Sequence, residues 1–205
     1  RTLAPLLAAA GCAPSWHWSR GDTPGCETLA PVDVVLLAVP DAAIEGACQA
    51  LAQRPSARHE VWLHLSGSRP GTVGRIDPLT PAAMGCLHPL QALPGAPVPP
   101  THLHGVTAGI DGEPGALSVA TTLGLALGMV PRRLPSDSKA LYHAAAVTVA
   151  GHATALFSQA MEMLAACGFS PEDAQHALRP LLSGVVDNLG AGPPSAVITG
   201  PITRG

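Results

Sequence analysis

The sequence predicts an α/β domain built on a mostly parallel sheet, followed by an all-helical domain. Short strand-like and helical segments alternate over the first two thirds of the 205 residues, which is the rhythm of βαβ units. The run Val32–Val39 is nearly all apolar and rich in β-branched residues, as is typical of a strand covered on both faces. After Pro135 the strand-like runs stop and Ala-rich helical patterns begin. We therefore expect an α/β domain over residues 1–135 and a helical domain over residues 136–205.

Glycine, proline and polar residues separate the expected elements of the first domain. The predicted helices are Thr2–Ala10, Ala42–Gln53 and Pro114–Leu127. The predicted strands are Ala13–Ser19, Val32–Val39, Glu60–Ser66, Met84–His88 and Gly105–Ile110. The segment Pro94–Pro100 is too rich in proline to form a helix or strand.

Two long helices are predicted in the second domain. Ser136 or Asp137 can cap a helix that runs from Lys139 to about Ala166. Polar residues interrupt its apolar pattern, so we expect a buried helix and not a membrane span. One face of this helix carries small and apolar residues that are suited to packing against another helix, and we expect a homodimer through the C-terminal helices. These residues are Tyr142, Ala146, Val149, Ala153, Leu156, Ala160 and Met163.

The second of these helices has a clear start. Ser170 provides a capping hydroxyl, Pro171 occupies the first helical position, and two acidic residues follow in the first turn. Pro180 lies inside the helical pattern and should kink or divide the helix, because proline removes a backbone donor.

Composition excludes several classes of protein. The net charge is −3, and no basic cluster is larger than Arg132-Arg133, which argues against a nucleic-acid-binding surface. The five cysteines contain no CxxC pair and are odd in number, so they indicate neither a disulfide framework nor a zinc site. The spacings His102-x-His104 and Cys86-x-His88 could each place two metal ligands on one strand face, but no complementary cluster accompanies them. We expect a cytoplasmic protein with a small-molecule partner and no bound metal, nucleic acid or membrane.

A parallel sheet binds ligands at the carboxyl ends of its strands, so the residues that follow each predicted strand are candidates for a binding site. These residues are Ser19-Arg20, Ala38-Val39-Pro40 and Ser66-Gly67-Ser68. In dinucleotide-binding folds an arginine at the position of Arg20 favours the 2′-phosphate of NADP, although a surface loop arginine is an equally simple interpretation. Small residues in the other two segments would let a flat ring and its ribose approach the backbone.

The glycine-rich phosphate loop of such a fold should join the first strand to the first helix, and this chain starts inside that helix. Either the chain is a fragment or it does not bind a dinucleotide.

Five segments carry a family resemblance: VVLLAVPDAAI, HLSGS, LHPLQAL, DSKALYHAAAV and TGPITRG. They resemble the motifs of Rossmann-like oxidoreductases with a C-terminal helical domain of unknown function. These proteins belong to the 6-phosphogluconate dehydrogenase-like superfamily, beside ketopantoate reductase, pyrroline-5-carboxylate reductase and prephenate dehydrogenase. The resemblance runs from Leu3 to Gly205. It implies that the first strand and the glycine-rich loop precede Arg1 and that the chain stops within its last motif, so we expect a truncation at both ends.

Lys139 is the only lysine in a chain that otherwise uses arginine for its cations. An ammonium is compact and releases a proton more readily than a guanidinium. Two branches of the superfamily place a catalytic lysine on the first long helix of the second domain, with an asparagine four residues later. The resemblance therefore implies a catalytic Lys139, with His143 at the asparagine position on the same helix face. Lys139 would act as a general acid, and His143 would hold the substrate or share the proton.

Three further residues are candidates for substrate binding. His88 ends a predicted strand, although it could equally donate a hydrogen bond to a nearby carbonyl. Thr199 and Arg204 lie in the last motif, where the arginine could grip a carboxylate; a loop arginine is the simpler interpretation.

The resemblance implies an NADP-dependent oxidoreductase that uses NADPH to reduce a small 2-keto acid or imine, in the manner of ketopantoate reductase. A non-catalytic dinucleotide-binding sensor is an alternative. A prephenate dehydrogenase-like oxidoreductase that depends on His88 more than on Lys139 is another.

Overall fold

The computed structural model describes residues 3–15, 17, 32–54, 57–76 and 81–197. The chain forms two compact units, Arg1–Ala146 and Val147–Gly205. The first turns of helix α4 (Lys139–Ala166) thus belong to the same unit as the sheet. The predicted domain boundary between residues 135 and 136 stays a prediction.

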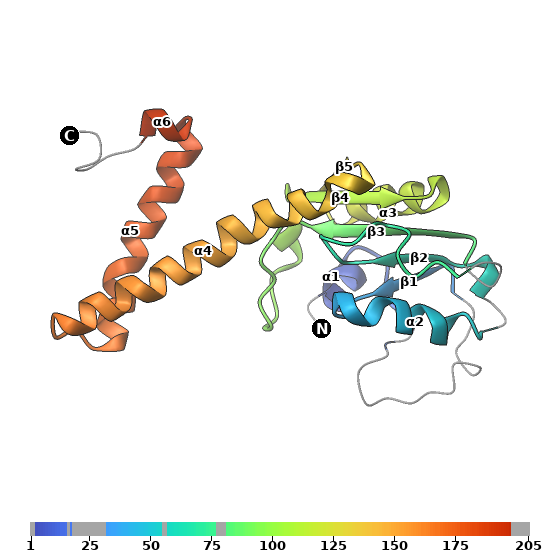
Figure 1. Ribbon diagram of the computed structural model, residues 1–205, viewed down its shortest axis with the longest axis horizontal. Helices are drawn as coiled ribbons and strands as arrows, with labels where there is room; N and C mark the ends of the chain where they lie inside the picture. Colours follow the sequence, from blue (N-terminus) through green and yellow to red (C-terminus); the bar gives the residue numbers. More distant parts are fainter. Residues whose placement is uncertain (1–2, 16, 18–31, 55–56, 77–80, 198–205) are drawn as a thin grey trace. The chain divides into compact units, whose positions relative to one another are not determined.

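A five-stranded sheet forms the centre of the first unit (Figure 1). Its strands lie in the order β1 (Val34–Leu37), β2 (Val61–His64), β3 (Ala83–Pro89), β4 (Thr107–Gly112) and β5 (Val130–Arg133). Strands β1, β2 and β3 are parallel, β4 is antiparallel to β3, and β5 is parallel to β4. This confirms the predicted mostly parallel sheet and adds β5, which was not expected.

The register of the parallel strands brings their carboxyl ends together. Leu37 pairs with His64, and His64 pairs with Cys86. The segments that follow β1 and β2 therefore leave the sheet side by side, next to the later part of β3. The predicted site residues after β1 and β2 lie at this edge.

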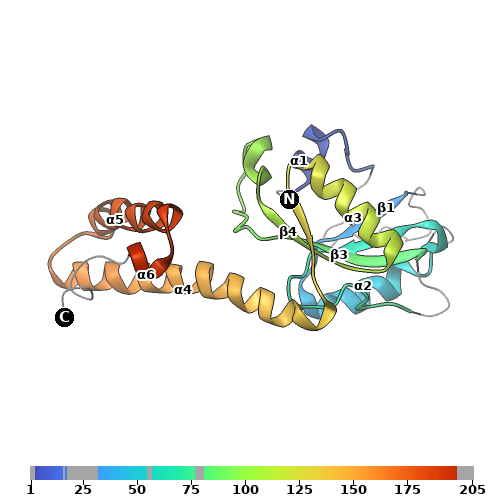
Figure 2. The same cartoon turned by 90° about the horizontal axis from the view of Figure 1, so that it is seen from above.

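Helices cover both faces of the sheet (Figure 2). Helices α1 (Leu3–Ala9) and α3 (Pro114–Ala126) pack into one core that includes Leu63, while α2 (Ile44–Leu51) packs into a second core that includes Trp62. Leu63 and Trp62 are neighbours on β2, and successive side chains of a strand point to opposite faces. Because both faces of the sheet are covered, the sequences of its central strands are almost entirely apolar.

Most predicted elements of the first unit are confirmed to within a few residues. A single 3₁₀ turn, Asp41–Ala43, precedes α2. The segment Pro94–Pro100, expected to contain no helix or strand, has neither as far as Pro99, but Pro100 begins the short 3₁₀ helix Pro100–Leu103. Within the predicted strand Ala13–Ser19 the described residues, 13–15 and 17, are not in a strand, and the others lie outside the described residues.

The helical part of the chain contains α4, α5 (Pro171–Ala191) and α6 (Pro194–Val197). The side chain of Ser170 caps α5 as predicted, accepting a hydrogen bond from the backbone N–H of Asp173 at 3.1 Å. Pro180 was expected to kink or divide the second helix; it does not divide it, since α5 continues through Pro180, and a kink stays a prediction.

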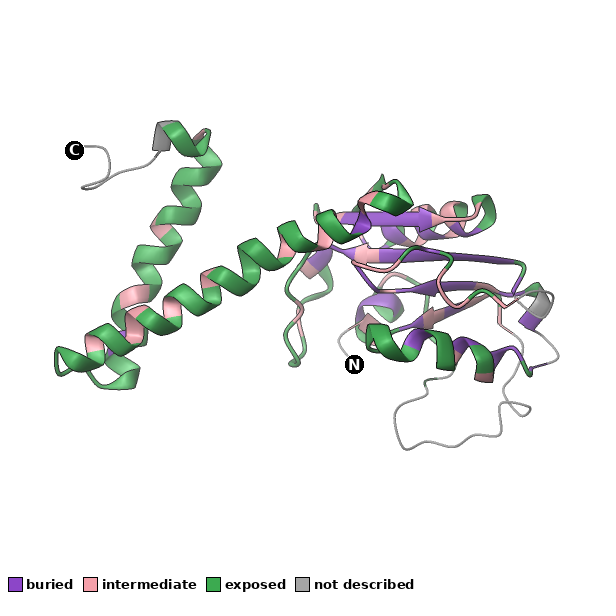
Figure 3. Ribbon diagram, in the orientation of Figure 1, coloured by how far each residue is buried: buried purple, intermediate pink, exposed green. Residues whose placement is uncertain are grey.

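The expectation that the first long helix is buried is wrong for the chain by itself. Lys139 is the only buried residue of α4, and Val149, Leu156 and Met163 are 75%, 65% and 68% exposed (Figure 3). Burial requires a covering surface, and the described part of this chain provides none for these side chains. The segment Ser136–Ala166 is long and apolar enough to cross a membrane by length and composition only, with a mean hydropathy of 1.2 over an 18-residue window.

Candidate functional site

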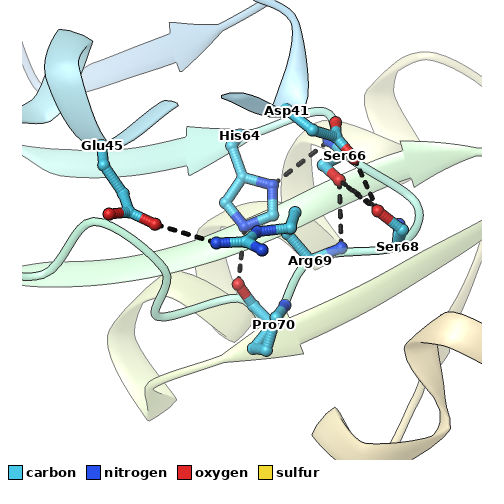
Figure 4. Close-up of polar contacts among 7 residues, drawn as sticks. All are labelled: Asp41, Glu45, His64, Ser66, Ser68, Arg69 and Pro70. Carbon is cyan, nitrogen blue, oxygen red and sulfur yellow. Dashed lines mark hydrogen bonds and ion pairs between the residues drawn. The ribbon is translucent and has the colours of Figure 1, made fainter. Parts of the chain in front are cut away.

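A hydrogen-bonded network joins the segments that follow β1 and β2 (Figure 4). The hydroxyl of Ser68 donates to Asp41 Oδ2 at 2.5 Å, and Ser66 Oγ accepts from the backbone N–H of Arg69 at 3.0 Å. Burial tends to raise the pKa of Asp41, but hydrogen bonds from Ser68 and Ser66 and two nearby histidines outweigh it, so the pKa is lowered. Asp41 is therefore an anion that holds the two segments together at neutral pH.

His64, the last residue of β2, fixes the start of the second segment. Its Nδ1 accepts from the backbone N–H of Ser66 at 3.2 Å, so its Nε2 carries the proton and donates to the carbonyl of Pro70 at 2.9 Å. The side chain is fully buried. This burial is the largest cause that lowers the pKa of His64 to about 4. A neutral imidazole thus holds both ends of the segment Ser66–Pro70.

The free energy of unfolding is expected to fall as the pH drops from about 6.5 towards 4. His64 has a folded-state pKa of about 4 against 6.5 for the free side chain, so only the unfolded chain binds this proton in that range. The stabilisation that neutral His64 contributes to the folded state is complete above pH 6.5. It is lost as the pH falls through 4, and the free energy of unfolding changes by up to about 1.4 kcal/mol per pH unit. Denaturant unfolding at several pH values measures the slope. His64→Gln should reduce the slope, to which His88 also contributes because its pKa is likewise lowered to about 4, whereas His59→Gln, at an exposed site, should not; equal slopes would contradict the assignment.

Lys139 reaches the same segment from the first turn of α4. Its side chain is fully buried. The Nζ atom donates to the carbonyl oxygen of Ser66 at 2.9 Å and to Cys86 Sγ at 2.7 Å. An ammonium has three N–H donors, so two such contacts leave one donor for a ligand. Burial raises the pKa of the Cys86 thiol although the lysine charge opposes this, so the partner of Lys139 is a neutral thiol at pH 7.

A second carboxylate positions the start of α4. Asp111 on β4 accepts from the hydroxyl of Ser136 at 2.8 Å and from the backbone N–H of Gly71 at 2.7 Å. Ser136 begins the 3₁₀ turn that leads directly into Lys139. Asp111 thereby links the turn before Lys139 to Gly71, which directly follows the segment Ser66–Pro70.

His143 lies beside His88, and both were predicted to belong to the substrate site. The centroids of their rings are 5.8 Å apart, and the ring planes are inclined by 80°. Both rings pack against Gly67, where a Cβ atom would lie only 2.6 Å from His143 Nδ1 and 2.7 Å from His88 Nε2. Gly67 was expected to admit a flat ring close to the backbone, and in the structure the rings that approach it are these two imidazoles.

The predicted site residues fall into two groups. One group meets at the carboxyl edge of the sheet and consists of Ala38, Val39, Pro40, Ser66, Gly67, Ser68, His88, Lys139 and His143. The other, consisting of Ser19, Arg20, Thr199 and Arg204, lies outside the described residues. The catalytic, cofactor and substrate roles of all these residues stay predictions.

Four residues of the site were not predicted. Tyr142 was assigned to helix packing, but its hydroxyl lies 3.2 Å from His88 Nδ1. Asp41, His64 and Cys86 were not singled out as members of the site. For His64 a signal was present, because a histidine at the end of an apolar strand must find hydrogen-bond partners when it is buried. The contact between Cys86 and Lys139 joins residues 53 positions apart and left no local pattern.

Comparison with known proteins finds one family model that matches part of the chain. Residues 106–205 match "Domain of unknown function (DUF2520)". The matched region covers β4, β5 and the helices α3 to α6. It therefore includes Lys139 and His143 but none of the segments after β1 and β2. No curated protein matches the chain.

Solved structures share the fold over most of the chain. A protein of Thermotoga maritima is 21% identical with a TM-score of 0.69, over 87% of this chain and 67% of its own. A Bacteroides fragilis protein, provisionally named an NADP oxidoreductase, is 17% identical with a TM-score of 0.81, over 99% of this chain and 81% of its own. Plasmodium falciparum pyrroline carboxylate reductase, solved with NADP bound, is 10% identical with a TM-score of 0.64, over 94% and 75%. These likenesses confirm the Rossmann-like α/β fold with a helical C-terminal region.

Proposed function

We propose that this protein is an NADP-dependent oxidoreductase that reduces a small 2-keto acid or imine, in the manner of ketopantoate reductase. The observation that carries the proposal is the position of Lys139, whose buried ammonium donates to Ser66 and Cys86 at the carboxyl edge of the sheet. Ligands of open α/β sheets bind at this edge. Two of the solved structures with this fold are named as reductases, the pyrroline carboxylate reductase of Plasmodium falciparum and an imine reductase of Streptomyces aurantiacus.

The residues that follow β1 are suited to bind the flat part of the cofactor. Ala38, Val39 and Pro40 are exposed next to Ser68, so the backbone after β1 is open to a flat ring and its ribose. When bound, NADPH would supply the hydride. The chain's own contribution is the proton: the third N–H of Lys139 Nζ is available to the substrate oxygen or nitrogen as charge develops there. Ser66 and Cys86 hold the ammonium in place while this happens.

Cofactor preference tests the first half of the proposal. NADPH and NADH are titrated against the full-length protein, and the dissociation constants are read from the fluorescence of the reduced nicotinamide. We expect NADPH to bind more tightly and Arg20→Ala to remove the difference, because an arginine contacts the 2′-phosphate. Arg179→Ala, at an exposed position of α5, is the control. A preference for NADH, or indifference to Arg20→Ala, would refute the phosphate assignment.

Turnover tests the second half. A panel of 2-keto acids and cyclic imines is screened for oxidation of NADPH, measured by the loss of absorbance of the reduced nicotinamide. Activity on one class identifies the reaction. If NADPH binds but no compound is reduced, the non-catalytic sensor becomes the better interpretation. If only oxidation of a prephenate-like substrate occurs and His88→Asn abolishes it, the dehydrogenase alternative is favoured.

We also propose that the protein is a homodimer through its C-terminal helices. Val149, Leu156 and Met163 lie on the predicted packing face of α4 and are exposed in the single chain, so a second copy would remove apolar surface from water. Light scattering after size exclusion is expected to give twice the chain mass for the wild type and the chain mass for Leu156→Asp. Gln159→Asp, at an exposed polar position of the same helix, should leave the dimer intact. A monomeric wild-type protein would contradict the proposal.

A further inference from the structure

Two buried charges in the described part of the chain are not matched by an ion pair. The charged side chains that are buried there, at 0% to 6% exposure, are Arg54, Glu60, Asp111 and Lys139. Arg54 and Glu60 pair with each other at 2.8 Å, whereas Asp111 and Lys139 form no ion pair with any described residue. A buried charge is costly unless an opposite charge or hydrogen bonds compensate it. The ammonium of Lys139 therefore needs compensation from its surroundings.

The direct contacts of Lys139 supply only part of this compensation. Its Nζ atom donates to the carbonyl oxygen of Ser66 at 2.9 Å and to Cys86 Sγ at 2.7 Å. The carbonyl carries a partial charge, and the thiol is neutral at pH 7 because burial raises its pKa. Neither contact provides a full negative charge, which is what best offsets the loss of water around an ammonium.

Asp111 places a carboxylate beside the thiol that contacts Lys139. Asp111 on β4 pairs directly with Cys86 on β3, and directly paired side chains share one face of the sheet with Cβ atoms about 4.5–5.5 Å apart. Burial has the largest effect on the pKa of the Cys86 thiol, which Lys139 lowers and Asp111 raises. Beside the larger effect of burial, the same two charges act in opposite senses on His64. Asp41 also acts on His64, but it is exposed and water screens its charge.

The same carboxylate ties together the two segments that set the position of the ammonium. Asp111 Oδ1 accepts from the hydroxyl of Ser136 at 2.8 Å, and Oδ2 accepts from the backbone N–H of Gly71 at 2.7 Å. Ser136 begins the turn that leads into Lys139, and Gly71 follows the segment whose Ser66 carbonyl binds the ammonium. The contact is so close that a Cβ on Gly71 would overlap the backbone carbonyl of Asp111.

We propose that Asp111 is the positioning residue for Lys139, whose ammonium it holds against Ser66 and compensates as a counter-charge. The dependence is one-sided, because Asp111 keeps its two hydrogen bonds when the lysine is replaced. Asp111 acts on the reaction only through Lys139. The inference rests on the proposed function where turnover is concerned, but the position of the ammonium is a property of the fold and can be measured without a substrate.

Acylation of Lys139 measures how firmly the ammonium is held. Lys139 is the only lysine of the sequence, so its modified fraction can be read by mass spectrometry of the peptide that contains it, after brief treatment of the full-length protein with acetic anhydride. Asp111→Asn is expected to raise the labelling rate about tenfold or more, because an amide offers one acceptor atom to two donors. Asp137→Asn, which removes an exposed carboxylate from the same turn, is the control. Labelling of Asp111→Asn at the wild-type rate would overturn the positioning role.

A pair of variants at Ser136 decides the same point without changing the buried charge. Ser136→Ala removes one of the two hydrogen bonds to Asp111 and should raise the labelling of Lys139 by a smaller factor. Ser136→Thr keeps the hydroxyl and should label as the wild type does. Labelling that is equal in Ser136→Ala and Ser136→Thr would contradict the proposed link through Asp111.

Urea unfolding tests the counter-charge. Asp111→Asn should lower the midpoint of unfolding, because it leaves the ammonium buried without compensation. In the Lys139→Met background the same substitution should lower the midpoint by less than half as much, since no ammonium is left to compensate. Equal losses in the two backgrounds would overturn the counter-charge.

Turnover separates this inference from the proposed function. Asp111→Asn should lower kcat about tenfold or more and leave the dissociation constant of NADPH unchanged, because a misplaced proton donor slows the chemical step. Asp137→Asn should keep the wild-type kcat. A wild-type kcat in Asp111→Asn would overturn the positioning role. If the wild-type protein reduces no compound, the reductase function alone is refuted, and labelling and unfolding still decide the role of Asp111.

Discussion

Lys139→Met is expected to abolish turnover and to leave NADPH binding nearly unchanged. The methionine side chain has a similar length but no proton to give, and loss of a general acid lowers the rate by about 10²- to 10⁴-fold. The contacts of Lys139 are a carbonyl and a neutral thiol, so the substitution leaves no buried carboxylate unpaired. Relief from burying an ammonium offsets the lost hydrogen bonds, and the variant should fold. Steady-state kinetics and cofactor titration are the measurements.

Two further variants make this result specific. Lys139→Arg keeps the charge but places a group that does not release its proton, so we expect it to be inactive as well. Arg179→Met removes a cation from an exposed position of α5 and should keep full activity. Turnover retained by Lys139→Met would exclude a catalytic Lys139, and the proposed mechanism with it.

Breaking the ion pair between Arg54 and Glu60 is expected to have the largest effect on stability. Arg54 Nη2 lies 2.8 Å from Glu60 Oε1, Nη1 lies 3.1 Å from Oε2, and the side chains are 1% and 0% exposed. Trp62 Nε1 also donates to Glu60, at 3.0 Å. Arg54→Met leaves a carboxylate in a dry site, which typically costs about 3–5 kcal/mol of unfolding free energy. Urea unfolding measures the loss.

The double variant Arg54→Met/Glu60→Leu distinguishes the effect of removing the whole ion pair from the effect of removing one partner. It should lose much less than the sum of the two single variants, because it removes both buried charges together. The exposed pair of Arg69 and Glu45 has the same 2.8 Å separation with side chains 43% and 60% exposed, and Arg69→Met should cost less than about 1 kcal/mol. Equal losses at the buried and the exposed pair would contradict this explanation.

Strand β5 shows why part of the sheet escaped prediction. Its four residues, Val130–Arg133, include a proline and two arginines, which argue against a central strand. Proline is tolerated here because β5 lies at the edge of the sheet and pairs with β4 alone. Edge position is a property of the assembled sheet, so no local pattern could reveal it. The antiparallel direction of β4 has the same origin.

Local signals were sufficient for the helices, and the family resemblance implied the candidate proton donor. The capping hydroxyl of Ser170 and the helix that begins at Lys139 are where the sequence predicts them, because caps and helical periodicity act within one or two turns. The lone lysine and a histidine one turn later were likewise visible as residue types at a given spacing. The sequence by itself therefore determined the fold class and a short list of site residues.

Only the tertiary structure decided how these residues are held. Lys139 meets Ser66 and Cys86 across 73 and 53 residues of chain, and His143 meets His88 and Gly67 through the same approach of α4 to the sheet edge. Hydrogen bonds and pKa shifts depend on burial and on distances in space, and neither follows from separation along the chain. For that reason the neutral His64, the buried thiol of Cys86 and the paired histidines over Gly67 emerged only from the folded protein.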